Sequence, residues 1–149
     1  MMIENLKIIF NRDLNRLKTE IEAYEDEANL WEINGDIKNS AGNLCLHLIG
    51  NLNTYIGAEF GKSGYVRHRE LEFSLKDIPK TELLTMIEQT IKVVDESLSL
   101  LKEEDLAQEY PTLVFEGKTS TGFFLIHLTT HLTYHLGQIN YHRRLLATL

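Results

Sequence analysis

The chain has 149 residues, of which 43% are hydrophobic and 25% are charged, and its formal net charge is −7. This length and composition are typical of one globular domain, so we expect a single domain over residues 1–149 with one hydrophobic core. The negative charge, together with the lack of a lysine-rich run, argues against a protein that binds DNA or RNA.

A first helix is predicted over about residues 3–28. Apolar residues recur there at intervals of three and four from Leu6 to Tyr24, and the positions between them are largely polar or charged. This spacing is typical of an amphipathic helix with one buried face. Residues 34–36, Asn-Gly-Asp, then have the composition of a turn.

A second helix is predicted to begin after Ser40, because serine is a preferred N-terminal cap. We expect this helix to continue to about Tyr55 and to weaken at Gly57 and Gly61. Residues 62–77 are predicted to be a connection, which is longer than most connections in helical bundles.

A third helix is predicted over about residues 79–102, because proline suits the first helical turn and a regular apolar stripe follows. Residues 103–118 are irregular, and their apolar run 113–115 is either a β-bridge or a packed loop. Any of residues 119–121 can cap a fourth helix over about 122–146. Four helices of about 20 residues each predict an all-α four-helix bundle with long crossover connections.

Histidines give the sequence its clearest chemical signal. His127, His131 and His135 are spaced i, i+4 and i+8, which places them on nearly one face of the last helix. Two imidazoles at i and i+4 can reach one metal ion. A third ligand must then come from another helix, and His47 is the obvious candidate. Three imidazoles with an open position are typical of catalytic zinc, although nickel or iron would also suit them.

The spacing leaves the role of His127 open: it is an alternative ligand, a hydrogen-bond partner of a ligand, or a substrate-facing residue. Gln138 shares the face of His131 and His135 and is expected either to orient a ligand or to bind substrate. Asn51, on the predicted helix of His47, is assigned to the same surroundings.

The competing interpretation is a histidine-rich core that holds no metal. Burying four imidazoles without partners would cost about 1–3 kcal/mol each, which counts against it. We expect His142 at the surface or at a helix end and His68 in solvent. Cys45 lies about 200° round the helix from His47 and should face away from the site as a small packed side chain.

The motifs together resemble the DinB-like (DNA-damage-inducible) superfamily. A histidine on the second helix is followed on the last helix by His-x-x-x-His-Leu-Gly-Gln at residues 131–138. The resemblance covers essentially the whole chain. It is strongest to small bacterial proteins of unknown function, which share stretches like residues 43–52, 67–73 and 137–144.

This resemblance implies a four-helix bundle with a three-histidine site at one end and frequent homodimers. By position, the metal ligands of the superfamily fall on His47, His131 and His135, and His127 lies beside them. Better-known relatives are S-transferases and isomerases that use bacillithiol or mycothiol.

Two functions follow as hypotheses. In the first, the chain is an enzyme, a thiol S-transferase or hydrolase, whose metal activates a water or a low-molecular-weight thiol. Arg67 and Arg69 would then bind a carboxylate of the thiol, unless their segment is a solvated loop with Glu70 and Glu72 as surface partners. In the second, the chain is a non-enzymatic metal-binding or dimerising protein with a structural or sensor site.

The location of the protein is predicted from absences. No stretch approaches ~18 uncharged apolar residues, the length that a membrane-spanning helix needs. The N-terminal stretch lacks the features of a secretory signal. Cys45 is the one cysteine, so the chain cannot form an internal disulfide. We therefore expect a cytoplasmic protein with a small-molecule substrate and neither a nucleic-acid nor a membrane partner.

Overall fold

The computed structural model describes residues 1–147. Its α-helices are α1 (Met2–Glu22), α2 (Ala41–Leu52), α3 (Arg69–Ser74), α4 (Lys80–Leu98) and α5 (Thr121–Leu146). A π-helical segment, η2 (Asn53–Ala58), continues α2, and two short 3-10 helices are η1 (Glu27–Trp31) and η3 (Glu103–Ala107). Over these residues β-structure is limited to one isolated bridge between Glu109 and Ser120. The all-α prediction is confirmed.

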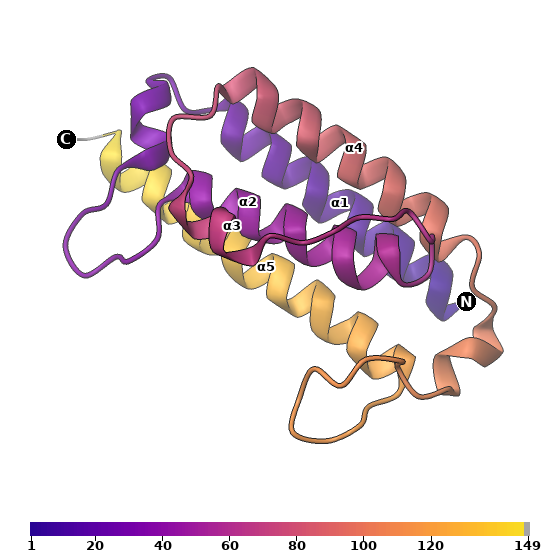
Figure 1. The fold of residues 1–149 in the computed structure, drawn as a ribbon. Helices are drawn as coiled ribbons and strands as arrows, with labels where there is room; N and C mark the ends of the chain where they lie inside the picture. Colours follow the sequence, from indigo (N-terminus) through magenta and orange to yellow (C-terminus); the bar gives the residue numbers. More distant parts are fainter. Residues whose placement is uncertain (148–149) are drawn as a thin grey trace.

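The four long helices pack as a bundle (Figure 1). α1 lies against both α4 and α5, and α2 contacts the same two helices from the other side. α1 and α5 run in one direction, whereas α2 and α4 run in the other. The chain must therefore cross back along the bundle between α2 and α4, and this crossover carries α3, which lies on α2. The predicted long crossover connection is present.

The first helix ends earlier than its apolar spacing suggests, at Glu22 instead of about residue 28. The reason is local. The carboxylate of Asp26 accepts a hydrogen bond from the backbone N–H of Ala28 at 3.0 Å and caps η1. Such a side-chain bond competes with continuation of the helix. Tyr24, although outside the helix, is still buried.

α2 is the central helix, and all twelve of its residues are buried. Ser40 caps it as predicted, because its hydroxyl accepts from the N–H of Asn43 at 3.2 Å. The helix ends close to the glycines, as expected: its π-helical continuation stops at Ala58, one residue after Gly57, and Gly61 lies in the turn that follows. Gly57 lies inside the π-helical continuation, and a Cβ there would collide with Val93 on α4.

The remaining boundaries agree with the sequence to within a few residues. Pro79 immediately precedes α4, which ends at Leu98. Ser120 is the residue that caps α5, accepting from the N–H of Phe123 at 3.1 Å. Residues 113–115 form a loop between the two residues of the isolated bridge. The Phe115 ring packs on Phe124, whereas Leu113 and Val114 are exposed.

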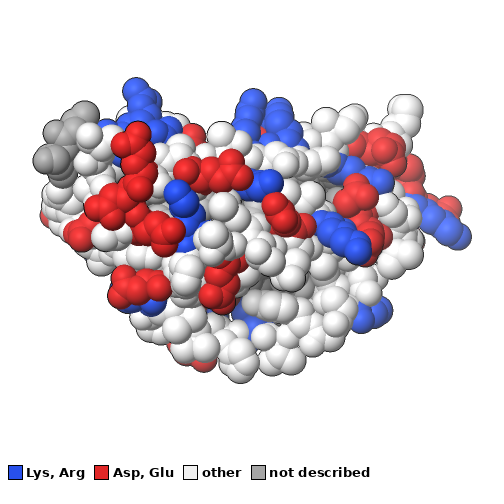
Figure 2. Space-filling model, turned by 90° about the horizontal axis from the view of Figure 1, so that it is seen from above, with Lys and Arg blue, Asp and Glu red and all other residues white. Residues whose placement is uncertain are grey.

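Charged side chains of both signs are interspersed over the face seen in Figure 2. Between α1 and α4, Lys18 pairs with Glu88 at 2.9 Å and Lys7 pairs with Asp95 at 3.5 Å. Within residues 1–147, none of the helices is both long and apolar enough to cross a membrane.

Candidate metal centre

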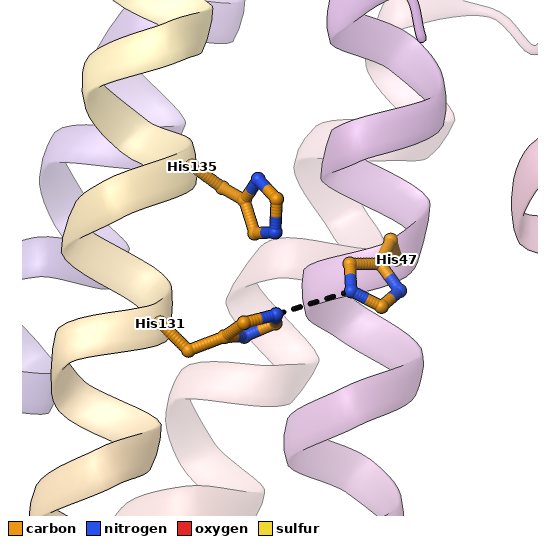
Figure 3. A group of neighbouring side chains, drawn as sticks. All are labelled: His47, His131 and His135. Atoms are coloured by element: carbon orange, nitrogen blue, oxygen red, sulfur yellow. Dashed lines mark hydrogen bonds between the residues drawn. The ribbon is translucent and has the colours of Figure 1, made fainter. Parts of the chain in front are cut away.

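Three histidines from two helices meet between α2 and α5. His47 comes from α2, whereas His131 and His135 come from successive turns of α5. Figure 3 shows the two rings of α5 pointing toward His47. One ring nitrogen from each residue can be chosen so that all three lie within 4.8 Å of one another. These three side chains could hold a metal ion, and we call them the histidine triad.

The ring orientations of two triad members are set by their hydrogen bonds. Nδ1 of His47 lies 3.0 Å from Oε1 of Glu72, and Nδ1 of His135 lies 2.7 Å from Oε1 of Gln138. Because carboxylate and amide oxygens accept, each Nδ1 must carry the proton. In the neutral ring, Nε2 then keeps its lone pair for a ligand.

His131 is not a satisfied core histidine. Its Nδ1 is buried and has no hydrogen-bond partner, and its Nε2 lies 3.2 Å from Nε2 of His47. Two nitrogens bound to one ion at ~2.1 Å are separated by roughly 3.0–3.4 Å at octahedral or tetrahedral angles. The observed separation therefore fits two ligands of a single ion, and the donor set suits zinc, nickel or iron.

His131 and His135 are in the protonation state that binds a metal. Burial, together with the neighbouring His135 and His47, lowers the pKa of His131 to about 4. Burial lowers the pKa of His135 as well, and the bond to Gln138 offsets this only in part. Both rings are therefore neutral near neutral pH, which is the form that binds divalent metals.

Glu72 lies directly behind His47. The alternative in which residues 67–73 are a solvated loop made Glu72 a surface partner, and it is wrong for this residue, which is only 6% exposed. Its carboxylate accepts from Arg67 Nε at 2.8 Å and Nη2 at 2.9 Å, as well as from His47. Burial would raise the pKa of Glu72, but these hydrogen bonds and the charge of Arg67 outweigh it and lower the pKa. An ionised carboxylate thus fixes the proton of His47 on Nδ1.

The packing of α3 on α2 explains why Glu72 is buried. Asn43 of α2 donates from Nδ2 to the carbonyls of Glu72 and Leu75, each at 2.9 Å. Gly50 leaves space for the carboxylate, because a Cβ at that position would overlap it. Neither contact is visible in the sequence, where Glu70 and Glu72 look alike within a connection.

A polar pocket of about 170 Å³ opens beside the triad. Its wall includes His47, His131, Asn51, Tyr55, Arg67, Arg69, Val114 and His127. Asn51 lies near the triad as expected, and its buried Oδ1 has no hydrogen-bond partner. His127 packs edge-on against Phe115 and is not one of the three candidate ligands.

The two arginines of this pocket differ in what they can bind. The Nε and Nη2 atoms of Arg67 are occupied by Glu72. Binding of a substrate carboxylate by Arg67 stays a prediction. Arg69 is exposed, lies over the ring of Phe73 at 5.3 Å and reaches the pocket, so its guanidinium can still meet an anion.

The other singled-out residues lie away from the triad. His142 was expected at the surface or at a helix end. It lies near the C-terminal end of α5 but is buried, with Nδ1 2.6 Å from the Tyr24 hydroxyl and Nε2 2.9 Å from the Glu32 carbonyl. His68 is exposed, as expected. Cys45 is fully buried outside the triad, and burial raises the pKa of its thiol to about 12.

Comparison with known proteins places the chain in one family. The profile of a family described as "Protein of unknown function (DUF1572)" matches residues 3–148, which is nearly the whole chain. Comparison with curated proteins found no match. The matched residues include all three histidines of the triad. The chain belongs to the DUF1572 family of proteins of unknown function.

Proposed function

We propose that this protein is a metal-dependent enzyme of the DinB-like superfamily that acts on a small molecule. The proposal rests on the histidine triad. Hydrogen bonds at Nδ1 orient the rings of His47 and His135, and each of the three residues offers one ring nitrogen within 4.8 Å of the other two. The His-x-x-x-His-Leu-Gly-Gln stretch supports the superfamily placement.

The number and charge of the ligands favour an enzyme over a structural site. Structural zinc usually has four protein ligands, whereas the group of candidate ligands within residues 1–147 has three. Three neutral imidazoles leave the charge of a divalent ion uncompensated and one position open. An ion bound there would lower the pKa of a coordinated water or thiol. The polar pocket supplies room for that reactant.

The residues of the pocket then have distinct tasks. His47, His131 and His135 would hold the ion, and Glu72 keeps His47 in the correct tautomer. Arg69 binds an anionic group of the substrate. His127, on the pocket wall, lies where it can take up a proton.

Thiol transfer and hydrolysis are the two reactions that fit. In thiol transfer, the thiol gives its proton to His127, its sulfur forms a bond to an electrophilic carbon, and the leaving group departs with the electron pair. In hydrolysis, the oxygen of water forms a bond to the electrophilic carbon, one proton of the water passes to His127, and the leaving group departs with the electron pair. Besides the metal ion that the triad would hold, both reactions need His127 and a substrate with a good leaving group.

An activity screen tests this proposal. Untagged protein is loaded with Zn²⁺, Ni²⁺ or Fe²⁺ and assayed with low-molecular-weight thiols and a model electrophile, and separately with activated esters. We expect turnover with at least one metal and its loss in His131→Ala, whereas His68→Ala, which changes an exposed histidine, should keep it. Equal turnover in wild type and His131→Ala would show that the triad is not the catalytic site.

A further inference from the structure

A second and larger cavity includes His135 in its wall. Its volume is about 640 Å³, and it is formed between the C-terminal half of α5 and residues 36–39. Its wall includes Ile37, Leu44, Tyr134, His135, Gln138 and Tyr141. Sites for small ligands commonly enclose ~300–1,000 Å³, so this cavity is large enough for one.

The residues of the histidine triad are divided between the walls of the two cavities. His47 and His131 belong to the wall of the small polar pocket, and His135 belongs to the wall of the large cavity. A ligand in the large cavity would therefore contact the same candidate metal centre through His135.

The large cavity differs from the polar pocket in chemistry. Apolar atoms make up most of its wall. Its charged residues, Asp36 and Lys38, have opposite signs and stand on the loop at its edge. The cavity therefore favours a neutral, apolar group over an anion, whereas Arg69 marks the polar pocket as the place for an anion.

Two tyrosines indicate the shape of that group. Tyr134 and Tyr141 are 65% and 66% exposed, although aromatic side chains gain most from burial. They are seven residues apart on α5 and share one face, with Gln138 between them. Oε1 of Gln138 accepts from His135, which leaves its amide N–H groups to donate to a ligand. A planar ring with a hydrogen-bond acceptor matches these features.

We propose that the large cavity binds an aromatic part of the substrate, held between the tyrosines with an acceptor atom toward Gln138, while the reacting group lies at the triad. The assignment rests on the proposed function, since it concerns the substrate of that site. The substrate class is thus a small molecule that joins an aromatic ring to a polar reacting group.

Binding of anisole tests the assignment, because anisole has an aromatic ring and an ether acceptor but no reactive group. Backbone and side-chain amide resonances of the full-length protein are followed by NMR during titration, with 1,4-dioxane as a non-aromatic control. We expect saturable shifts at Tyr134, Tyr141 and the Gln138 side-chain amide. Tyr134→Ala should weaken binding about fivefold. Phe123→Ala, which removes another exposed aromatic of α5 outside the cavity, should not.

Co²⁺-loaded protein tests the connection to the triad. Paramagnetic Co²⁺ should broaden the signals of bound anisole, and His131→Ala should abolish the broadening. If anisole causes no shifts, if both aromatic variants weaken it equally, or if Co²⁺ binds without broadening it, the cavity assignment is wrong while the metal site stands. If Co²⁺ does not bind at all, the proposed function is wrong, and the substrate assignment falls with it even where anisole occupies the cavity.

Discussion

At the scale of single residues, His47 shows how a buried ion pair can prepare a metal ligand. Its Nδ1 is held by Glu72, and Glu72 is held in turn by two nitrogens of Arg67. The positive charge and hydrogen bonds of Arg67 favour the ionised form of the buried Glu72 carboxylate. The tautomer of His47 is therefore fixed before a metal ion binds. A ligand whose tautomer and ring orientation are already set loses less entropy on binding.

Glu72→Gln tests this role. The amide keeps the shape of the side chain but loses the charge that fixes the His47 proton and pairs with Arg67. We expect the affinity for Zn²⁺ to fall roughly 10–100-fold, measured by competition with a chromophoric chelator. Glu70→Gln, on an exposed side chain of the same helix, is the control. Equal affinities in the two variants would show that Glu72 only fills space.

The buried pair of Tyr24 and His142 gives a second prediction at this scale. Tyr24→Phe removes the hydroxyl that donates to Nδ1 of His142 and leaves that nitrogen without a partner. We expect the free energy of unfolding in urea to fall by about 1–3 kcal/mol. Tyr134→Phe, which removes an exposed hydroxyl, should have little effect. A destabilisation of the same size in both variants would contradict the importance of this hydrogen bond.

At the scale of the elements, two glycines in helices have opposite environments. A Cβ at Gly50 of α2 would overlap the Glu72 carboxylate, whereas a Cβ at Gly137 of α5 would meet nothing within 4 Å. Gly50 is therefore required by the contact between α2 and α3. Gly137 has no such requirement within residues 1–147 and carries only the entropic cost of glycine in a helix.

Substitution by alanine at Gly50 and at Gly137 should change the free energy of unfolding in opposite directions. Gly50→Ala is expected to push α3 away, to weaken Zn²⁺ binding, and to lower the free energy of unfolding by about 1–3 kcal/mol. Gly137→Ala should instead raise the free energy of unfolding by about 0.5–1 kcal/mol. Urea unfolding and chelator competition measure both quantities. If Gly50→Ala binds Zn²⁺ as tightly as wild type, the close packing of α3 does not control the site.

The elements also show where sequence reasoning works. Regular apolar spacing identified the four long helices, and Ser40 gave a correct helix start because capping is a local interaction. The short helix α3 could not be predicted in this way. It depends on Asn43 binding its carbonyls across 29 and 32 residues of sequence, and no local pattern records such a contact. The burial of Glu72 was missed for the same reason.

At the scale of the whole molecule, the same distinction applies to the candidate site. Helical spacing placed His131 and His135 on one face, and the structure brings His47 to them because α2 and α5 are neighbours. The two cavities could not be predicted, because each is formed by segments far apart in sequence. The burial of His142 could not be predicted either, because its partner, the Glu32 carbonyl, belongs to the C-terminal flank of η1.

Asp13 of α1 forms a contact with α5 that depends on the ionisation of its carboxyl group, so the stability of the fold should depend on pH. It is fully buried and accepts from Arg12 at 2.8 Å and from Thr133 of α5 at 2.9 Å. Burial would raise the pKa of Asp13, but the hydrogen bonds from Arg12 and Thr133 and the nearby arginine charges outweigh it and lower the pKa below 3.8. The ionised form is therefore favoured by folding. Its stabilisation is complete above the unfolded pKa and is lost as the pH falls through the folded one.

Asp13→Asn should show that pH dependence. We expect the difference in unfolding free energy between wild type and Asp13→Asn to be largest near neutral pH and to shrink as the pH falls below about 4. Asp36→Asn, on an exposed loop, is the control for removing one carboxylate. Urea unfolding at a series of pH values measures the difference. A difference that stays constant or grows on acidification would contradict the assignment.

The metal content of the protein tests the central claim most directly. Protein made without a histidine tag is loaded with Zn²⁺, passed through a desalting column and analysed by mass spectrometry of the elements. The histidine triad predicts close to one ion per chain in wild type, and a loss of that ion in His47→Ala, His131→Ala and His135→Ala but not in His68→Ala. A wild-type protein that retains no metal, or triad variants that retain it fully, would contradict the assignment of His47, His131 and His135 as a metal centre.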